Sequence, residues 1–297
     1  DRTLLRKYNE IQQREHELLE KIKKLEEANR SLSTSSPQSS TLGMEFSAMS
    51  AALSASAWLE KAYSLWSNGR FGDPNTAIEH LGKAIDLDNK NPRTYNSRAV
   101  AYLNLEKFPQ AEADLQTALR LNPSYAGAHN NLGIHYFHVG QYGEGLKHLD
   151  AALALEPDNP DYLFNMAQMY LVHWPNIMTL RQWTAAETYA EAMRVSGKAA
   201  ALAPGDFELV RDHALNFFAA ERMNAQPDWK RAVKAWVAAR KAARNQDEIF
   251  YTWMNEGRVW LRAQNGREAE RCFLEAVALR PQSGLAQGLL TDARSVK

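Results

Sequence analysis

The chain has 297 residues, of which 45% are apolar and only 15 are glycine, so it is long enough to bury a sizeable apolar core. Its 35 lysines and arginines balance its 35 aspartates and glutamates, so the net charge is zero. This balance excludes a long-range electrostatic attraction of the whole chain to nucleic acid or to an anionic membrane. One cysteine excludes an internal disulfide and any multi-cysteine metal site, and no apolar run reaches the roughly 18 residues of a membrane-spanning helix.

Residues 1–32 carry a heptad pattern that predicts a coiled-coil dimerisation helix. Leucine or isoleucine occupies every d position between Leu4 and Leu32, and the β-branched Ile22 stands at an a position. This combination favours two parallel strands. We therefore expect a homodimer with contacts through Leu4, Ile11, Leu18, Ile22 and Leu25. A single amphipathic helix docked on the rest of the chain is the alternative, because Tyr8 and Glu15 weaken the a row.

Residues 33–46 are expected to form a flexible linker, because a stretch this rich in serine and threonine buries too little apolar surface to order itself. An alanine-, serine- and methionine-rich run then leads up to Trp58. We expect it to be a helix that covers the open end of the main body, which spans residues 47–297.

One spacing pattern recurs along residues 55–283. In one copy it consists of Tyr95, Ala99, Tyr102, Ala111, Leu115, Ala118 and Pro123, and 34 residues later it consists of His129, Gly133, Tyr136, Gly145, Leu149, Ala152 and Pro157. The small residues let two antiparallel helices approach closely, and each proline ends a helix. The 34-residue period resembles the tetratricopeptide repeat (TPR), whose unit is a helix, a turn and a second helix. The resemblance implies an all-α, right-handed α-solenoid.

Six copies and a capping helix account for this part of the chain. We place them at 55–91, 92–125, 126–159, 160–206, 207–249 and 250–283, with the C-terminal cap at 284–297. Three copies are irregular: extra residues fall at Asn68–Pro74 and between Tyr170 and Ala192, and the turn around Gln226–Asp228 is looser. Insertions of this kind are expected in loops.

In TPR proteins a fixed set of positions on each first helix faces an inner groove. The sixth position is polar in every copy: Glu60, Ser97, Asn131, Asn165, Asp212 and Asn255. An asparagine amide donates and accepts hydrogen bonds at once, so asparagines one repeat apart can hold an extended peptide by its backbone. The string His129–Gly133 resembles the asparagine ladder in the TPR region of O-linked N-acetylglucosamine transferase, without that enzyme's catalytic domain.

The predicted partner-binding residues are therefore Asn96, Asn130, Asn131, Phe137, Asn165, Gln168, Arg211, Asn255 and Arg258, in which the apolar and charged members supply anchors and charge selectivity. Ordinary solvated or turn-capping asparagines are the alternative. Chaperone tails are a less favoured ligand. The carboxylate clamp of chaperone-binding TPR domains needs Lys at the fifth position and Asn at the ninth, and this chain has Leu59, Asn96 and Asn130 at the fifth.

The segment 229–244 is basic, with Lys230, Arg231, Lys234, Arg240, Lys241 and Arg244 and no acid. We interpret these cations as the solvated outer face of a second helix. An acidic protein, a phosphate backbone or lipid headgroups could also bind there.

No arrangement in the sequence predicts catalysis. His129, His135, His138 and His148 cluster, but no carboxylate on the first of their helices completes a metal site, so we interpret them as structural or solvated. Nucleophile, zinc-helix and glycine-rich phosphate motifs are absent. We expect neither a metal nor a cofactor, and Cys272 is expected to pack as a small hydrophobic residue.

The sequence thus predicts a non-enzymatic TPR scaffold that dimerises through its first helix and holds a peptide or protein segment in its groove. No nucleic acid partner and no membrane span are expected. The alternatives are a regulatory or targeting region of a larger enzyme, and a binder of an anionic surface through 229–244. Coiled coil followed by TPR also resembles periplasmic coordinator proteins, and the chain does not begin with Met. We therefore slightly favour the bacterial cell envelope over the cytoplasm.

Overall fold

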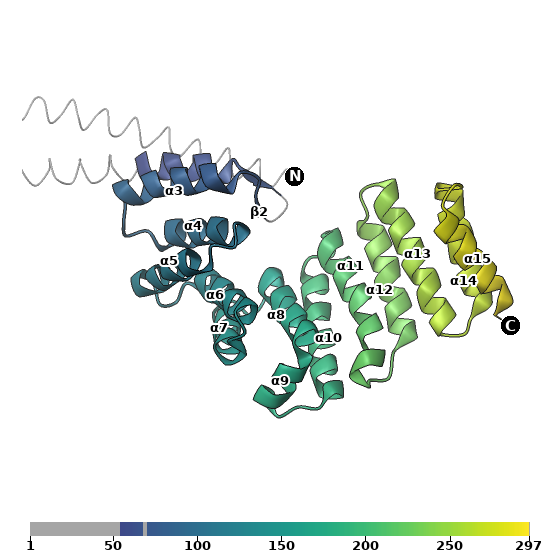
Figure 1. Ribbon diagram of the computed structural model, residues 1–297. Helices are drawn as coiled ribbons and strands as arrows, with labels where there is room; N and C mark the ends of the chain where they lie inside the picture. The colour runs from purple at the N-terminus through teal and green to yellow at the C-terminus, as the bar shows by residue number, and fades with distance from the viewer. Residues whose placement is uncertain (1–53, 68–69, 297) are drawn as a thin grey trace, which may run out of the picture. The chain divides into compact units, whose positions relative to one another are not determined.

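A computed structural model describes residues 54–67 and 70–296 of the chain (Figure 1). The predicted coiled coil at 1–32 and linker at 33–46 lie outside the described residues. The described part confirms the all-α fold of stacked helix pairs, and it divides into two compact units: unit 1, with described residues 54–67 and 70–131, and unit 2, with residues 132–296. Each unit is treated by itself below. No helix in the described ranges combines the length and the apolar character that crossing a membrane requires.

Unit 1 is built from helices that pack on one another in chain order. Residues 54–63 are helical. A two-stranded hairpin and three helices follow: β1 (Trp66–Ser67), β2 (Arg70–Phe71), α3 (Pro74–Leu87), α4 (Pro92–Asn104) and α5 (Phe108–Leu121). Helix α6 (Ala126–His138) begins in unit 1. Helix α4 packs against α3 and α5, and the core under the hairpin contains Leu59, Ala62, Phe71, Ala77, Leu81 and Ala101.

Polar side chains fix where the helices begin. Asn91 accepts a hydrogen bond from the backbone of Arg93, and Pro92 occupies the first helical position, where its missing N–H costs nothing. Asn159 caps α8 in the same way, with Pro160 behind it. The starts of α4 and α8 are therefore set by local backbone chemistry and not by packing alone.

A left-handed residue closes the first helix of three pairs. Glu106, Gly140 and Gln264 all have φ between 56 and 79°. In each turn the next backbone N–H returns to a carbonyl five residues back, as from Lys107 to Tyr102 at 3.0 Å. This hydrogen bond satisfies an end carbonyl and reverses the chain, so the second helix runs antiparallel to the first.

Unit 2 continues the same architecture. Its elements are α7 (Tyr142–Leu155), α8 (Pro160–Val172), α9 (Trp174–Arg181), α10 (Ala185–Leu202), α11 (Phe207–Asn216), the 3₁₀ turns η1 (Phe217–Ala219) and η2 (Glu221–Met223), α12 (Trp229–Ala242), α13 (Gln246–Arg262), α14 (Gly266–Leu279) and α15 (Gly284–Ser295). Helices α10 to α15 each pack on the next (Figure 1). The extra residues predicted between Tyr170 and Ala192 form α9 instead of a loop, and this helix contacts α7, α8 and α10.

Small residues set the spacing of α6 and α7 within unit 2. A Cβ on Gly145 would lie 2.6 Å from Cδ2 of Phe137, and a Cβ on Gly133 would lie 2.6 Å from Cγ of Leu149. Both distances are impossible for real side chains, so the two helices approach only because these positions are glycine. Ala152, the next small residue of the pattern, is fully buried.

Candidate functional site

Three asparagines form a continuous chain of side-chain hydrogen bonds in unit 1. The Nδ2 of Asn131 donates to Oδ1 of Asn96 at 2.9 Å, and Nδ2 of Asn130 donates to Oδ1 of Asn131 at 3.2 Å. Asn96 lies on α4 and the other two lie on the first half of α6, so the bonds join neighbouring repeats. We call Asn96, Asn130 and Asn131 the amide chain.

A second polar group lies on the same helix, α4. The hydroxyl of Tyr63 lies 2.6 Å from Oγ of Ser97 and accepts a hydrogen bond from Nε of Arg93 at 3.1 Å. The guanidinium of Arg93 also stacks 4.7 Å from the centre of the Tyr63 ring, and Arg93 is exposed. The sequence reading missed Tyr63 and Arg93. Both residues stand at groove-facing positions of the first two copies, and this position was the available signal. The residue type at these positions varies from repeat to repeat, so no recurring pattern marked them.

Asn96 and Arg93 keep hydrogen-bond donors that no described residue engages. Asn96 uses only its oxygen in the amide chain, so both of its N–H groups are uncommitted to any described residue. Arg93 forms no ion pair with a described residue, and its stacking on Tyr63 limits the conformations of its guanidinium. Donors held in place in this way lose little side-chain entropy when a carbonyl or carboxylate arrives.

The predicted residues of unit 2 lie on α6, α8, α11 and α13. Asn165 and Gln168 lie half-buried on α8. Arg211 on α11 is bracketed by two acids, Asp212 at 2.7 Å and Glu208. Its charge is therefore already compensated within its own helix, which leaves it little capacity to select an acidic ligand.

The expectation that Asn255 lies at a helix surface is wrong. Its side chain is 3% exposed. Its Nδ2 donates to the carbonyl of Tyr251 at 2.8 Å, and its Oδ1 accepts from Nη1 of Arg258 at 3.2 Å. The amide of Asn255 is therefore hydrogen-bonded within its own helix, and its role is structural.

The prediction that Phe137 is a groove anchor is also wrong. Phe137 is 2% exposed and packs between Gly145, Tyr142 and His173. The missing side chain at Gly145 leaves a space that the aromatic ring fills, so Phe137 belongs to the core.

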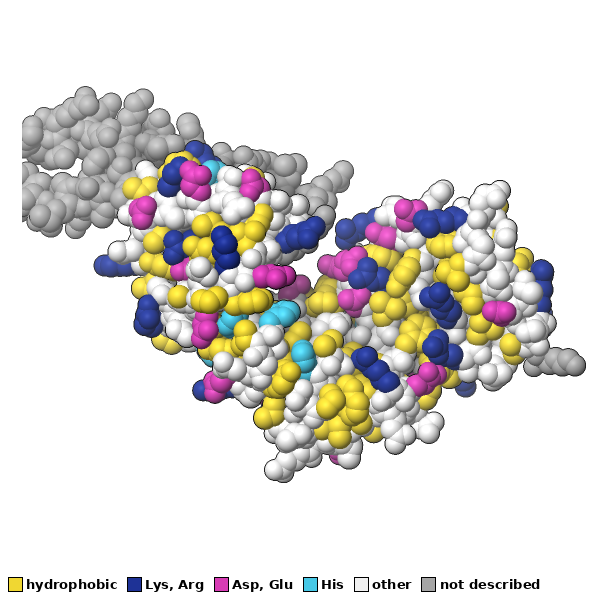
Figure 2. Space-filling view, viewed as in Figure 1, with side chains coloured by type: hydrophobic (Ala, Val, Ile, Leu, Met, Phe, Trp, Pro, Cys, Tyr) yellow, Lys and Arg dark blue, Asp and Glu magenta, His cyan; other side chains and the backbone are white. Residues whose placement is uncertain are grey.

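The basic side chains of 229–244 differ in whether they form an ion pair with a described residue. Lys230, Arg231, Lys234 and Lys241 are exposed on α12, and Arg244 is exposed just after it. Arg240 is different, because its Nη1 lies 2.7 Å from Oε2 of the buried Glu256 and its guanidinium stacks 3.4 Å from the Trp253 ring centre. On the face seen in Figure 2, basic and acidic side chains are interspersed rather than gathered by sign.

The histidines and the cysteine lie among other side chains of the helices. His135 is buried, His129 lies 3.0 Å from the carbonyl oxygen of Pro123, and His148 packs near the ring of Tyr136. Among the residues that the structure describes, no group of three or more histidine, cysteine, aspartate and glutamate side chains could hold a metal ion. Cys272 is fully buried, and burial together with Glu256 raises the pKa of its thiol to about 12.

Known proteins resemble parts of this chain. The tetratricopeptide repeat family matches residues 96–160. RNA polymerase II-associated protein 3 of Homo sapiens is 35% identical over 100 residues, 34% of this chain and 15% of that protein. Two further relatives each match over 87 residues, which is 29% of this chain. The small glutamine-rich tetratricopeptide repeat-containing protein 2 of Mycosarcoma maydis is 30% identical, and the match covers 25% of that protein. The Hsp70-Hsp90 organizing protein of Triticum aestivum is 28% identical, and the match covers 15% of that protein. Each match thus spans a quarter or less of the relative.

The solved structure of one other protein shares the fold. That of Pseudomonas aeruginosa pilF matches 80% of this chain and 97% of its own, with a TM-score of 0.57 and 16% identity. The first TPR of Spaghetti (RPAP3), bound to the HSP90 peptide SRMEEVD, is 33% identical and covers 36% of this chain and 83% of its own, with a TM-score of 0.34.

The preference for a bacterial cell envelope is wrong. The three curated relatives described above come from Homo sapiens, Mycosarcoma maydis and Triticum aestivum, all eukaryotes, and two of them are named for RNA polymerase II or for Hsp70 and Hsp90.

Proposed function

We propose that this chain, whose residues 96–160 match the tetratricopeptide repeat family, is a non-enzymatic adaptor that holds an extended segment of a partner protein on the first-helix face of unit 1. The observation that carries the proposal is the amide chain, with Asn131 bonded to Asn96 across 35 residues of sequence. A row of side-chain amides on neighbouring repeats offers hydrogen-bond donors and acceptors on successive helices. The backbone of an extended peptide can bond to these groups without recognition of its side chains.

Arg93 gives this surface a preference for acidic ligands. Its guanidinium is exposed, lies against Tyr63 and forms no ion pair with a described residue. A planar guanidinium binds a carboxylate through two parallel hydrogen bonds. We therefore expect peptides with an aspartate, a glutamate or a free C-terminus opposite Arg93 to bind more tightly.

The names of the relatives suggest chaperone tails as ligands, and the residues of unit 1 argue for a different peptide. At the fifth and ninth positions of the first copy, where a carboxylate clamp needs Lys and Asn, stand Leu59 and Tyr63. Leu59 is buried in the core, and Tyr63 is bonded to Ser97 and Arg93. Neither side chain can supply the cation that such a clamp requires.

The test is a peptide selection on the full chain from a random library, followed by fluorescence polarisation of the recovered peptides. Replacing both Asn96 and Asn131 by alanine should weaken binding at least about tenfold, because two lost amide contacts are each worth about 1 kcal/mol net. Asn89→Ala, an exposed asparagine in the turn before α4, is the matched control and should bind like the parent.

The peptide SRMEEVD serves as the chaperone-tail probe in the same assay. We expect it to bind more weakly than the selected peptides. Tight binding of SRMEEVD that Arg93→Gln abolishes would replace our proposal with a chaperone adaptor. Recovered peptides that bind the Asn96→Ala, Asn131→Ala double variant as tightly as the parent would show that the amide chain is structural only.

A further inference from the structure

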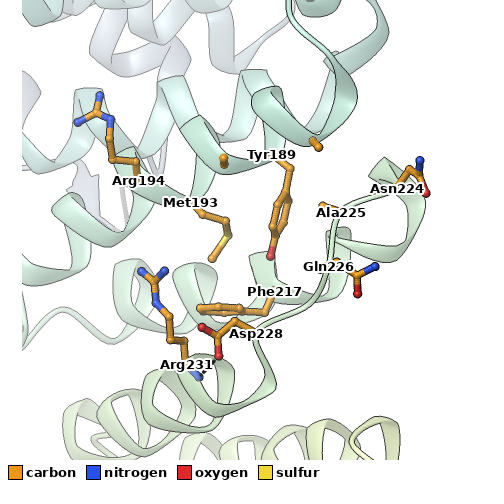
Figure 3. Close-up of a pocket in the computed structure, with 11 residues that line it drawn as sticks. Tyr189, Met193, Arg194, Phe217, Asn224, Ala225, Gln226, Asp228 and Arg231 are labelled. Carbon is orange, nitrogen blue, oxygen red and sulfur yellow. Dashed lines mark hydrogen bonds between the residues drawn. The ribbon is translucent and has the colours of Figure 1, made fainter.

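Unit 2 contains a cavity of about 540 Å³. It lies between α10, the connector that carries η1 and η2, and the start of α12 (Figure 3). Helices α10 and α12, the second helices of their pairs, both contribute lining residues to the cavity. We call it the connector pocket.

The floor of the connector pocket is apolar. Tyr189 and Met193 point into it from α10 and meet Phe217 from η1 (Figure 3), and all three side chains are buried. Ala186 and Ala190 are exposed at the rim, where small side chains leave the opening unobstructed. Apolar walls around an open space of this size are typical of ligand sites, because an apolar group that enters displaces poorly bonded water.

The hydroxyl of Tyr189 points into this cavity without a partner. Tyr189 is 8% exposed, its hydroxyl is directed toward Phe217 in Figure 3, and it forms no hydrogen bond with a described residue. Burial raises the pKa of this hydroxyl to about 12, so it remains a donor at neutral pH. The Tyr189 hydroxyl is therefore available to donate a hydrogen bond to a carbonyl of a ligand in the pocket.

Cations continue from the pocket along α12. Arg231 stands at the edge of the cavity, and Lys234 and Lys241 follow on the same exposed face. From Arg231 to Lys241 the helix rises about 15 Å. None of the three forms an ion pair with a described residue. The acid at the rim, Asp228, already caps α12 by accepting the backbone N–H of Arg231 at 2.9 Å.

We propose that the connector pocket docks an acidic peptide segment of a partner protein. One aromatic or large aliphatic side chain of the peptide fills the apolar cavity. Tyr189 donates its hydrogen bond to the peptide backbone beside that anchor. A run of about four or five acidic residues then follows the cations of α12, since an extended chain advances about 3.3 Å per residue. This site shares no residue with the amide chain, and the proposal stands whether or not the proposed function holds.

The experiment measures fluorescence polarisation with the full chain and three labelled peptides. The first probe has Phe followed by five Glu, the second has Ala in place of Phe, and the third has Gln in place of every Glu. The first should bind with saturation below about 1 mM, and the other two at least tenfold more weakly, because each lacks one half of the recognition.

Variants of the chain locate the binding. Tyr189→Phe removes only the unpartnered hydroxyl, so it should leave the melting temperature unchanged and weaken the first probe about fivefold. Ala190→Trp fills the mouth of the cavity and keeps every cation, and it should weaken binding at least tenfold. Arg231→Gln should weaken binding severalfold, whereas Arg267→Gln, the same charge change at an exposed position on α14, should not.

Several results overturn the proposal. They are no saturable binding of the first probe, equal binding of the Phe and Ala probes, and parental binding by both Tyr189→Phe and Ala190→Trp. Equal weakening by Arg231→Gln and Arg267→Gln overturns it as well, because that result attributes binding to net charge.

Discussion

Glu256 lies 1% exposed in α13, and its carboxylate accepts a hydrogen bond from Nη1 of Arg240 on α12 at 2.7 Å. The partner guanidinium is itself stacked 3.4 Å from the centre of the Trp253 ring. Arg271 from α14 approaches the other carboxylate oxygen at 3.4 Å. One buried acid therefore connects three successive helices, and it removes Arg240 from the set of cations available to a ligand.

Removing the carboxylate should destabilise unit 2 strongly. Glu256→Ala leaves Arg240 in a mostly buried place without its counter-charge, and we expect a loss of about 3 kcal/mol in the free energy of unfolding. Urea denaturation of the full chain measures it. The double variant in which Glu256 and Arg240 both become Leu should recover much of this loss, since no unpaired charge remains. A Glu256→Ala variant as stable as the parent would mean that the pair is solvated.

The repeat spacing predicted the helix pairs well, because small residues at Gly133, Gly145 and Ala152 have one physical meaning, close helix approach. The role of Arg240 could not be predicted in the same way. A basic stripe is visible along one helix, but the partner of Arg240 stands 16 residues later on the next helix, and only packing brings the two together.

The candidate site was predictable only in part. The sequence placed Asn96 and Asn131 on one face, and the structure joins them. Phe137 and Asn255 stand at positions that the family pattern assigns to the groove. Their surroundings decide otherwise, because the ring of Phe137 fills the space above Gly145 and Asn255 bonds to its own helix. Periodicity reports the direction of a side chain, and the size of its neighbours decides its burial.

The two classes of asparagine should separate in stability measurements. Asn255→Ala breaks two hydrogen bonds at a buried position and should cost about 1 to 2 kcal/mol. Asn96→Ala affects one bond at a half-buried position, and alanine is the better helix former, so it should cost less than about 0.5 kcal/mol. Thermal unfolding of the two variants compares them directly. Equal losses would contradict the different burial of the two residues.

Close packing between α6 and α7 predicts a second contrast. Gly145→Ala places a methyl group 2.6 Å from Phe137 and should cost about 1 to 3 kcal/mol. Ala152→Leu should cost a similar amount, because this alanine is fully buried. Gly288→Ala is the matched control, since no atom lies within 4 Å of the new Cβ on α15. That change should stabilise by about 0.5 to 1 kcal/mol, and a loss there would mean that the cap frays.

Dimerisation through residues 4–32 remains a prediction from the heptad pattern. Light scattering of the parent should give the mass of a dimer, and replacing both Leu18 and Leu25 by Glu should give a monomer, because two charges at d positions cannot be buried in the interface. Changing Lys21 and Glu26 to Gln provides a control outside the a and d rows. A dimer that survives the Leu18→Glu, Leu25→Glu change would place the contact elsewhere in the chain.

His213 makes the stability of unit 2 depend on pH. Its Nδ1 lies 2.8 Å from the hydroxyl of Ser196, and burial, assisted by the positive charge of Arg231, lowers the pKa of its imidazole to about 4. In the unfolded chain the same ring titrates near 6.5. Between these two values the unfolded state holds more protons than the folded state, so stability falls as the pH is lowered from 6.5 to 4.

The loss over that range should be on the order of 3 kcal/mol, because each unit between the two pKa values is worth about 1.4 kcal/mol. Urea denaturation at several pH values measures it, and His213→Gln should flatten the dependence by that amount. Ser196→Ala keeps the buried ring and should retain most of the slope, since burial is the main cause of the lowered pKa. A His213→Gln variant that loses stability in parallel with the parent would assign the slope to other groups and would place His213 in contact with solvent.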